Sequence, residues 1–438
     1  MDSFKNLHPF QIVLMAVFGI FALLGLIFFA NSKGLSNNTT NVGSIVVWGT
    51  LPSDAITKEL QALTTADKSY SKVTYVQEQP ASFDSALANA IASGNGPDLI
   101  IINQEQILSE SGKITIIPFS SIPQRTFSST YLPEDQLFLT TTGTYGVPYV
   151  LDPLVLYYNQ NMLTQAGIPT PPTTWEAVTG MIPVLTHNTL NTATAQSGIA
   201  LGTYSNIENA RGILSLLFMQ AGSPITQSSS LGVRSVLSKA TTATYGGTSP
   251  LAAALNFYTQ FADPSRTVYT WNSGNSSARQ AFLGGALAFY VGYASEEPQL
   301  KAGNPNLSFD MAQIPQLQTS TAKVDYALAY AFAIPKASHN AAGALQVANA
   351  LTGVLYLPAA AQSLSMAPAN RMLLTPSPND LYAPVYYPDA LISNGWLSPD
   401  PATTDSLFSA MIANVTTGKN RRSLRAMSNS VFPMTSLE

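Results

Sequence analysis

Hydrophobic and polar residues follow one another in blocks that predict strands alternating with helices. SIVVWGT at 44–50 is apolar and β-branched and predicts a buried strand, whereas DAITKELQALTTAD at 54–67 has apolar residues at helical spacing. KVTYVQEQ at 72–79 alternates as a strand does. SFDSALANAIASGNGPDLIIIN at 82–103 predicts a helix, a Gly-rich stop and a second buried strand. This order predicts an α/β fold with a mostly parallel sheet.

The later part of the chain continues the alternation. Four apolar runs predict further strands. In chain order they lie near 145–159, at the end of 276–293, near 307–315 and at 324–335. Helical patterns fill the remainder, and we find no internal repeat. The Thr/Ser/Gly-rich stretch 226–249 predicts a surface loop.

The N-terminal segment has a different character. From Phe10 to Ala30 the chain runs for 21 residues without a charge, and Gln11 is its one polar side chain. As a helix this run would be roughly 31 Å long, close to the thickness of a bilayer core. A cleavable signal peptide is the alternative, although its apolar region usually has only about 7–15 residues. We expect a cytoplasmic tail at 1–9, an uncleaved membrane anchor at 10–30 and a flexible tether at 31–43.

The composition excludes several classes of protein. Charged residues make up 10% of the chain, well below the roughly 25% of an average soluble domain. The net charge of −4 and the lack of a basic stripe give no support for nucleic-acid binding. Because the chain has no cysteine, disulfides, thiol catalysis, thiolate metal sites and a lipid-modified cysteine are excluded.

Catalytic motifs are missing as well. Of the three histidines, His187 and His339 would be exported, and neither has a metal-ligand partner at helical spacing. The chain has no nucleophile elbow, phosphate loop or zinc-protease motif. A glycosidase needs only two carboxylates, but one sequence does not pair them in space. We therefore predict no enzyme, no metal and no cofactor.

Four segments, in this order, resemble the extracellular solute-binding proteins of ABC importers, the family that includes maltose-binding proteins. They are SFDSALANAIASGNGPDLIII, YGVPYVLDPLVLYYNQNMLTQAGIPTPPTTWEAV, AFLGGALAFYVGYA, and FDMAQIPQ through YAFAIPKASHNAAGALQVANALT. The second carries the pattern Y-G-V-P, Y-Y-N, A-G-I and T-W-E and is the most specific. Two features depart from the family: the lipid-anchoring cysteine is missing, and Leu287 and Phe289 loosen the third segment.

The resemblance implies a two-lobed periplasmic-binding-protein-like fold of type II, with ligand held between the lobes. Lobe 1 would comprise 44–150 plus 315–366, and lobe 2 would comprise 151–314 plus 367–438. Gly146 and Pro148 would form a hinge, since glycine tolerates unusual backbone angles and proline stiffens the chain.

A sugar presents hydroxyls and a C–H face, which suit aromatic rings and hydrogen-bonding side chains. Trp48 ends the first exported strand, where ligands of parallel sheets lie, although it could instead plug the sheet end. Asp54 could instead cap a helix, and Asp152 could instead satisfy backbone N–H groups. Trp175 is expected to pack in the core. The predicted ligand-binding residues are Trp48, Thr50, Ser53, Asp54, Gln79, Asn103, Gln104, Tyr149, Asp152, Trp271, Asn272, Tyr293 and Trp396.

These observations favour a monomeric, membrane-anchored binding protein, with its large part extracellular or periplasmic. It would capture a neutral solute, a mono- or oligosaccharide, and deliver it to the permease subunits of an ABC importer. One alternative is a binding module of the same fold that serves sensing or surface attachment without a transporter. A glycoside hydrolase or other enzyme is the third.

Overall fold

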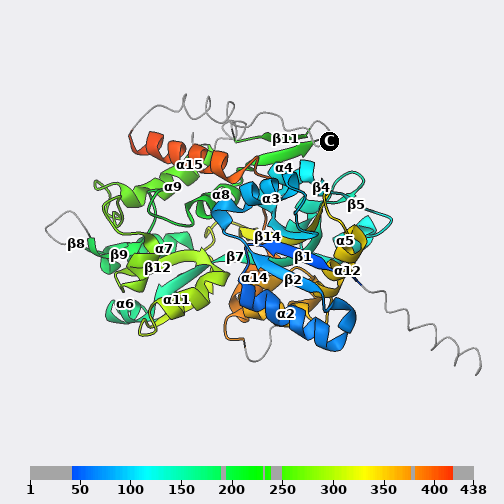
Figure 1. Cartoon of the computed structure of the whole chain (residues 1–438). Helices are drawn as coiled ribbons and strands as arrows, with labels where there is room; N and C mark the ends of the chain where they lie inside the picture. Colours follow the sequence, from blue (N-terminus) through cyan, green and yellow to red (C-terminus); the bar gives the residue numbers. More distant parts are fainter. Residues whose placement is uncertain (1–41, 189–193, 230–231, 238–248, 376–379, 418–438) are drawn as a thin grey trace, which may run out of the picture.

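A computed structural model describes residues 42–188, 194–229, 232–237, 249–375 and 380–417 (Figure 1). The predicted anchor at 10–30 and almost all of the tether at 31–43 lie outside these residues. Within the described part of the chain, no helix combines the length and the apolar character that crossing a membrane requires.

One large mixed sheet runs through the molecule. Its main path in spatial order is β2 (Val73–Gln77), β1 (Ile45–Gly49), β3 (Leu99–Asn103), β14 (Ala327–Pro335), β7 (Val147–Asn159), β12 (Leu287–Tyr293), β9 (Thr194–Ile199) and β8 (His187–Asn188). Off this path, β13 (Phe309–Gln313) and β15 (Ala367–Pro368) pair with β7, and β4 (Ile114–Thr115) pairs with β14. β1 is parallel to β2 and β3, β12 is parallel to β9, and β14 is antiparallel to both of its neighbours on the path.

β7 joins the two halves of this sheet. Its residues 147–153 pair with β14, and its residues from 154 onward pair with β12 and β13. In Figure 1 the elements β1, β2, α2 and α12 lie on one side of β7, and β9, β12, α7 and α9 lie on the other. The strand predicted around 145–159 is therefore confirmed. We call the part with β1, β2 and β3 the first half and the part with β12 and β9 the second half.

The reason for glycine at Gly146 differs from the one expected, and the hinge at Gly146 and Pro148 stays a prediction. It is not among the glycines with positive φ, so unusual backbone angles do not explain it. Instead, a Cβ at this position would lie 2.7 Å from the carbonyl oxygen of Phe332 on β14. The glycine therefore permits two backbones to approach closely where β7 enters the sheet. Pro148 is buried in the strand beside it.

Helices cover both faces of the first half. α2, α12 and α13 pack on the face that carries Val47 and Ile101, and α3 packs on the face that carries Ile100 and Ile102. These helices are α2 (Ser53–Ala66), α3 (Phe83–Ala92), α12 (Ala341–Leu351) and α13 (Leu357–Leu364). Shorter elements of this half are α4 (Ile107–Glu110), α5 (Gln124–Thr130), β5 (Ile117–Pro118) and β6 (Gly143–Thr144).

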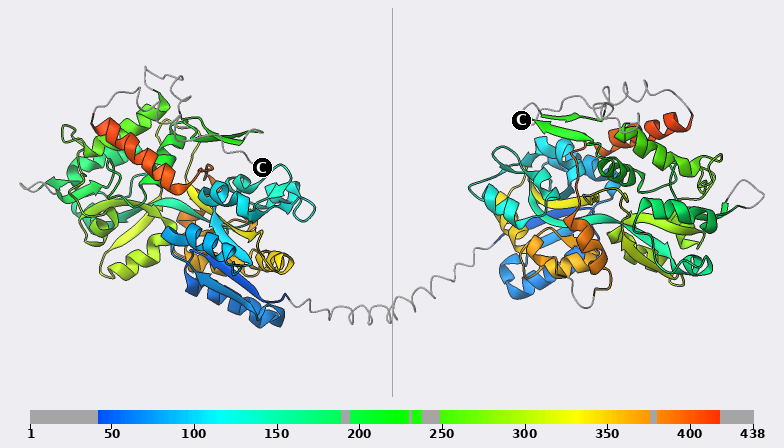
Figure 2. Two further views of the ribbon diagram at one scale, coloured as in Figure 1. Left: turned by 45° about the horizontal axis from the view of Figure 1, so that its top comes forward. Right: turned by 180° about the vertical axis from the view of Figure 1, so that it is seen from behind.

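The second half is covered by more helices, and the views in Figure 2 show α15 lying along α9. Its helices are α6 (Gln160–Gln165), α7 (Trp175–Leu185), α8 (Ala210–Gln220), α9 (Pro250–Thr259), α10 (Ala278–Leu283), α11 (Glu297–Gly303) and α15 (Pro401–Thr416). α14 (Ala383–Leu391) contacts β7, β13 and β15. The α/β prediction is confirmed. The lobe limits 44–150 plus 315–366 and 151–314 plus 367–438 stay a prediction.

The loop expected at 226–249 is partly wrong. β10 (Thr226–Ser229) and β11 (Gly232–Ser235) pair as an antiparallel hairpin. Thr and Val favour extended backbone, and Gly232 has a φ of 109°, which most other residues resist. Residues 238–248 lie outside the described part.

Candidate functional site

The carboxyl ends of three parallel strands meet at one edge of the first half. Trp48, near the end of β1, is half-buried and keeps part of its indole exposed. Gly49 follows it, and a Cβ there would lie 3.0 Å from the Tyr75 hydroxyl, which itself donates to the carbonyl of Leu51 (2.7 Å). This edge is tightly built around an accessible aromatic ring.

Polar groups at the ends of β2 and β3 extend this edge. Gln77 accepts a hydrogen bond from the amide of Ser53 at the start of α2 (2.9 Å). Asn103 accepts from the amide of Glu105 (3.0 Å), and its side chain lies against the hydroxyl of Tyr330, its partner across the sheet. Burial raises the pKa of Tyr330, so this phenol is a neutral hydrogen-bonding group.

Tyr293 reaches the same region from the second half. It ends β12, is half-buried, and its hydroxyl lies against Gly212 in the first turn of α8, where a Cβ would be only 2.5 Å away. Burial raises its pKa, and the nearby Glu105 and Tyr330 raise it further. Tyr293 and Tyr330, one from each half, therefore approach each other, and Tyr330 lies against Asn103 at the sheet edge where Trp48 lies near the end of β1. This set is our candidate site.

Asp152 has the structural role that we gave as the alternative to ligand contact. Only 2% of it is exposed, and it accepts hydrogen bonds from the amide (3.0 Å) and hydroxyl (2.6 Å) of Ser295. Burial raises its pKa to about 7. Its two acceptors thus serve the turn after β12, and its placement does not support a ligand contact.

The position of Tyr149 likewise does not support the predicted ligand contact. It is fully buried, donates to the carboxyl of Glu59 (2.6 Å) and packs against Phe332 with the ring centres 4.7 Å apart. A side chain without exposed surface offers nothing to a solute unless the structure rearranges. Tyr149 therefore belongs to the core of the first half.

Two predicted stacking tryptophans lie in the core of the second half. Trp271 is fully buried and its indole N–H faces Asn206 (3.4 Å), while Trp396 is 3% exposed and donates to Ser215 (3.0 Å). The expectation that they stack on a ligand is not supported by this placement. Trp175 is 1% exposed and donates to Gln220 (2.7 Å), so its packing role is confirmed.

Asn272 organises its own turn. Its side-chain oxygen accepts a hydrogen bond from the backbone amide of Gly274 (2.7 Å), and its side-chain NH₂ group donates to the hydroxyl of Tyr269 (2.9 Å). Gln104 is fully buried and holds β14 in place, since it accepts from the amide of Ala329 (2.7 Å) and donates to the carbonyl of Ala327 (2.9 Å). Both residues are therefore structural in this arrangement.

The remaining predicted residues lie near the strand ends. Thr50 and Ser53 are half-buried, and Gln79 and Asp54 are exposed. Asp54 does not cap α2, whose N-cap is Pro52 without a side-chain hydrogen bond. These four stay candidates for ligand contact.

Comparison with known proteins now identifies the family. The family model of the bacterial extracellular solute-binding proteins matches residues 52–354, most of the chain. The chain belongs to this family. No curated protein matches it in sequence. Members of a solute-binding family are receptors rather than enzymes, as the sequence predicts.

Solved structures of sugar-binding relatives share the fold. An ABC substrate-binding protein from Listeria monocytogenes in complex with cycloalternan has a TM-score of 0.68 at 14% identity, covering 89% of this chain and 97% of that one. The maltose/maltodextrin-binding domain from Bdellovibrio bacteriovorus bound to maltotriose has a TM-score of 0.67 at 12% identity, covering 89% and 98%. A solute-binding protein from Thermotoga lettingae bound with α-D-tagatose has 0.64 at 16%, covering 89% and 98%.

Sequence reasoning missed one charged network in this solute-binding protein. Arg211 on α8 forms two hydrogen bonds to Glu105, of 3.1 and 2.7 Å, and a third of 2.7 Å to Asp405 on α15. The hydroxyl of Tyr326 donates to the same Glu105 (2.6 Å). The partners lie far apart in sequence, so no local motif could have paired them. The scarcity of charge in this chain was the one available signal.

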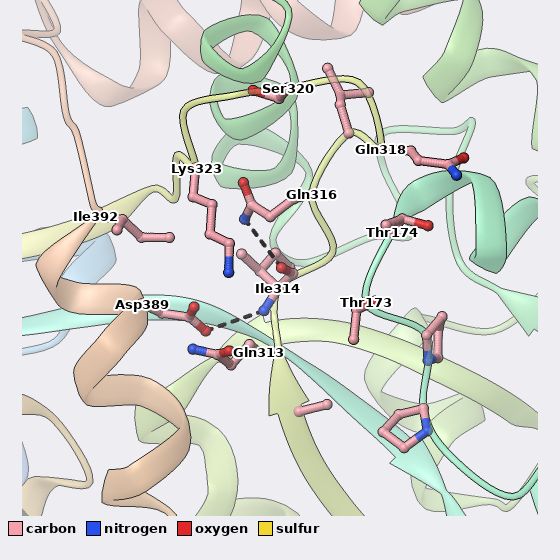
Figure 3. A pocket seen from close by; sticks show the side chains of 14 residues that line it. Thr173, Thr174, Gln313, Ile314, Gln316, Gln318, Ser320, Lys323, Asp389 and Ile392 are labelled. Carbon is pink, nitrogen blue, oxygen red and sulfur yellow. Dashed lines mark hydrogen bonds between the residues drawn. The ribbon is translucent and has the colours of Figure 1, made fainter.

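A polar pocket of about 380 Å³ lies elsewhere, where the loop 171–174, the segment 312–323 and the end of α14 meet (Figure 3). Asp389 forms part of its wall and accepts from the amide of Ile314 (3.2 Å). The side chain of Lys323 points toward Asp389. Within the described residues, no group of His, Asp and Glu side chains is arranged to hold a metal ion.

Proposed function

We propose that this protein captures a neutral mono- or oligosaccharide between the two halves and delivers it to an ABC importer. The observation that carries the proposal is the approach of Tyr293 from the second half to Tyr330, which lies against Asn103 in the first half, at the sheet edge where Trp48 lies near the end of β1. An indole face suits the C–H face of a sugar, and amide and phenol groups suit its hydroxyls. The sugars bound by the structural relatives support the same class of ligand.

The charges near the site favour a neutral ligand. Arg211 is the cation closest to Tyr293 in the network described above, and Glu105 and Asp405 already engage it. A guanidinium held by two carboxylates has little attraction left for an anion. A phosphate or carboxylate ligand would have to compete with both.

The protein would be held at the outer face of the membrane by residues 10–30, with the tether 31–43 leading to the binding domain. The length and apolar character of that segment support this part of the proposal. Protease added outside intact cells is expected to release a fragment cut within 31–43. A mature N-terminus near Asn31 would contradict it.

A thermal-shift panel of sugars, polyols, amino acids and phosphates tests the ligand class. A sugar present at 100 times its dissociation constant should add about 2.7 kcal/mol to the free energy of unfolding. Stabilisation by a phosphate or an amino acid, with none by sugars, would overturn the proposal. Co-purification with two permease subunits from native membranes would separate an importer role from sensing or attachment.

A further inference from the structure

Four buried carboxyls gather where separate passes of the chain cross between the two halves. Glu134, Asp135, Asp325 and Asp389, which we call the crossing carboxyls, are each exposed by 2% or less. Asp325 lies in the segment that leads from β13 in the second half to β14 in the first. Its amide donates to the carbonyl of Ile392 (3.2 Å), and its carbonyl accepts from the amide of Asn394 (2.9 Å).

Asp325 is placed where a negative charge is hardly tolerated. Among the described residues, neither of its carboxyl oxygens has a hydrogen-bond partner within the usual limits, although the amide of Tyr326 lies close to the carboxyl. The charged groups that face it are the carboxyls of Asp389 and Glu134. An ionised carboxylate buried among other acids, without a cation, is strongly disfavoured, so the neutral form must prevail in the folded protein.

Glu134 has a neighbour that can accept a hydrogen bond from a neutral acid. The hydroxyl of Ser393 lies against it but donates its proton to the carbonyl of Ala390 (2.9 Å). The Ser393 oxygen is therefore left as an acceptor, and a protonated Glu134 can donate to it, whereas a carboxylate cannot. Gly395 packs against the carboxyl so closely that a Cβ there would lie 2.5 Å from Oε1.

The other charges around Glu134 and Asp135 do not neutralise the pair. Glu105 faces Glu134, but Arg211 already engages it. Asp135 accepts one hydrogen bond from the amide of Leu132 (3.1 Å) and faces Glu134. Arg371 attracts the Asp135 carboxyl only weakly. Its guanidinium donates to backbone carbonyls instead, those of Ser128 and Tyr131.

Asp389 connects the cluster to solvent. One of its oxygens accepts from the amide of Ile314, and the residue lines the polar pocket of Figure 3. Lys323 points toward Asp389 in this pocket, and these two described side chains form no ion pair. Protons can therefore reach and leave the cluster through the pocket while the rest of it stays buried.

The same chemistry recurs outside the crossing. Glu59 is 5% exposed and accepts a hydrogen bond from the hydroxyl of Tyr149 rather than from a cation. Asp152 accepts one from the hydroxyl of Ser295. Burial raises the pKa of Glu59 and Glu134 to about 8 and that of Asp152 to about 7. It also raises the pKa of Asp135, Asp325 and Asp389 well above the ordinary value. The low charge content of 10% agrees with a protein that does not depend on ionised side chains.

We propose that the crossing carboxyls act as neutral acids that hold the two halves together, and that the protein is built to work in an acidic exterior. The part that concerns folding stands without the proposed function. The part that concerns solute capture rests on it, because looser crossings would change how the two halves meet around a sugar.

The direction of the effect follows from proton binding. The folded protein holds protons that the unfolded chain releases above about pH 4. Stability is therefore complete below that pH and is lost as the pH rises through the raised values near 7 and 8. Each extra bound proton changes the folding equilibrium constant up to tenfold per pH unit.

The test measures urea unfolding of the full chain in mild detergent, without ligand, between about pH 4 and pH 8.5. We expect stability to fall with rising pH. Asp325→Asn and Glu134→Gln, which mimic the neutral acids, should each flatten that slope by about one proton. Asp263→Asn is the control, because this exposed carboxyl has a lowered pKa and should not flatten the slope. Amide protection at 392–394, measured relative to the intrinsic exchange rate at each pH, should fall with rising pH in the parent and not in Asp325→Asn.

Stability of the unaltered protein that is constant or rises from pH 4 to pH 8.5 would overturn the proposal even if both variants fail to fold. Unchanged slopes in two folded variants would overturn the assignment to these residues. Because no ligand is present, a failure of sugar binding leaves this experiment unaffected. The two proposals can therefore fail separately.

Discussion

Arg211 and Glu105 form a two-pronged ion pair that ties the second half of the molecule to the first. Glu105 follows β3 and Arg211 begins α8, and their two hydrogen bonds measure 3.1 and 2.7 Å. The Glu105 side chain is 3% exposed and that of Arg211 is 25% exposed. Planar, paired contacts of this kind are stronger than exposed ion pairs, and breaking a buried one leaves a charge without a partner.

The first prediction concerns this pair. Glu105→Ala should cost about 3 kcal/mol of stability, and the unliganded protein should show a larger radius of gyration, because the tie between the halves is lost. Small-angle scattering and urea unfolding measure the two effects. Glu110→Ala is the matched control, since its partner Lys113 lies three residues away in the same segment. Equal radii for the two variants would contradict a tie between the halves.

The second prediction separates site from core among the tryptophans. Trp48→Ala should weaken sugar binding by roughly 1–3 kcal/mol, the scale of a buried aromatic contact, with a smaller effect on folding. Trp271→Ala should cost about 3–5 kcal/mol of stability, because it empties a packed core position. Calorimetric titration and denaturant unfolding give the two values. If Trp271→Ala instead weakens sugar binding and Trp48→Ala mainly lowers stability, Trp271 contacts the ligand and Trp48 belongs to the core.

The sequence predicts the strands themselves better than it predicts their arrangement in the sheet. Apolar runs predicted β1, β3, β7 and β14, because a strand buried on both faces has to be continuously apolar. The expectation of a mostly parallel sheet held for the first three strands, but β14 and β7 run antiparallel. Strand direction depends on where the chain crosses between the halves, and no local pattern records that.

The site was harder to predict, as two tryptophans show. Trp48 and Trp271 both stand next to polar, turn-like residues, yet one is half-buried at a strand end and the other is inside the core. In a strand, alternation fixes which side chains face inward, whereas a loop has no such period. Trp271 is buried because the backbone carbonyl of Phe261 accepts hydrogen bonds from the amides of Thr270 and Trp271. These bonds hold the turn against the core. Gly212 was missed because its contact with Tyr293 joins distant parts of the chain.

The third prediction uses that glycine. Gly212→Ala would put a Cβ 2.5 Å from the Tyr293 hydroxyl, so the tyrosine must shift away from α8 and leave its present position in the candidate site. We expect weaker sugar binding, measured by calorimetric titration, and a modest change in stability. Gly180→Ala in α7 is the control. Nothing lies within 4 Å of a Cβ there, so it should stabilise the helix by about 0.5–1 kcal/mol and leave binding unchanged. Unchanged affinity in Gly212→Ala would remove Tyr293 from the site.

The last prediction concerns Asp152, at the middle of β7. Burial raises its pKa to about 7, above the ordinary value of about 4. The folded state therefore binds this proton more tightly than the unfolded chain. Its contribution to stability is complete below about pH 4 and is lost as the pH rises toward 7, by at most about 1.4 kcal/mol per pH unit.

Asp152→Asn should match the parent protein at about pH 4 and exceed it in stability near pH 8, because the amide stays neutral and still accepts from the amide of Ser295. Ser295→Ala should shift the other way. It removes the 2.6 Å hydroxyl donor that stabilises the carboxylate, so the loss of stability at high pH becomes larger. Urea unfolding at both pH values measures these differences. If Asp152→Asn instead loses stability at high pH, the carboxylate is the form that the fold prefers. If it keeps its stability but loses affinity for sugar, Asp152 contacts the ligand after all.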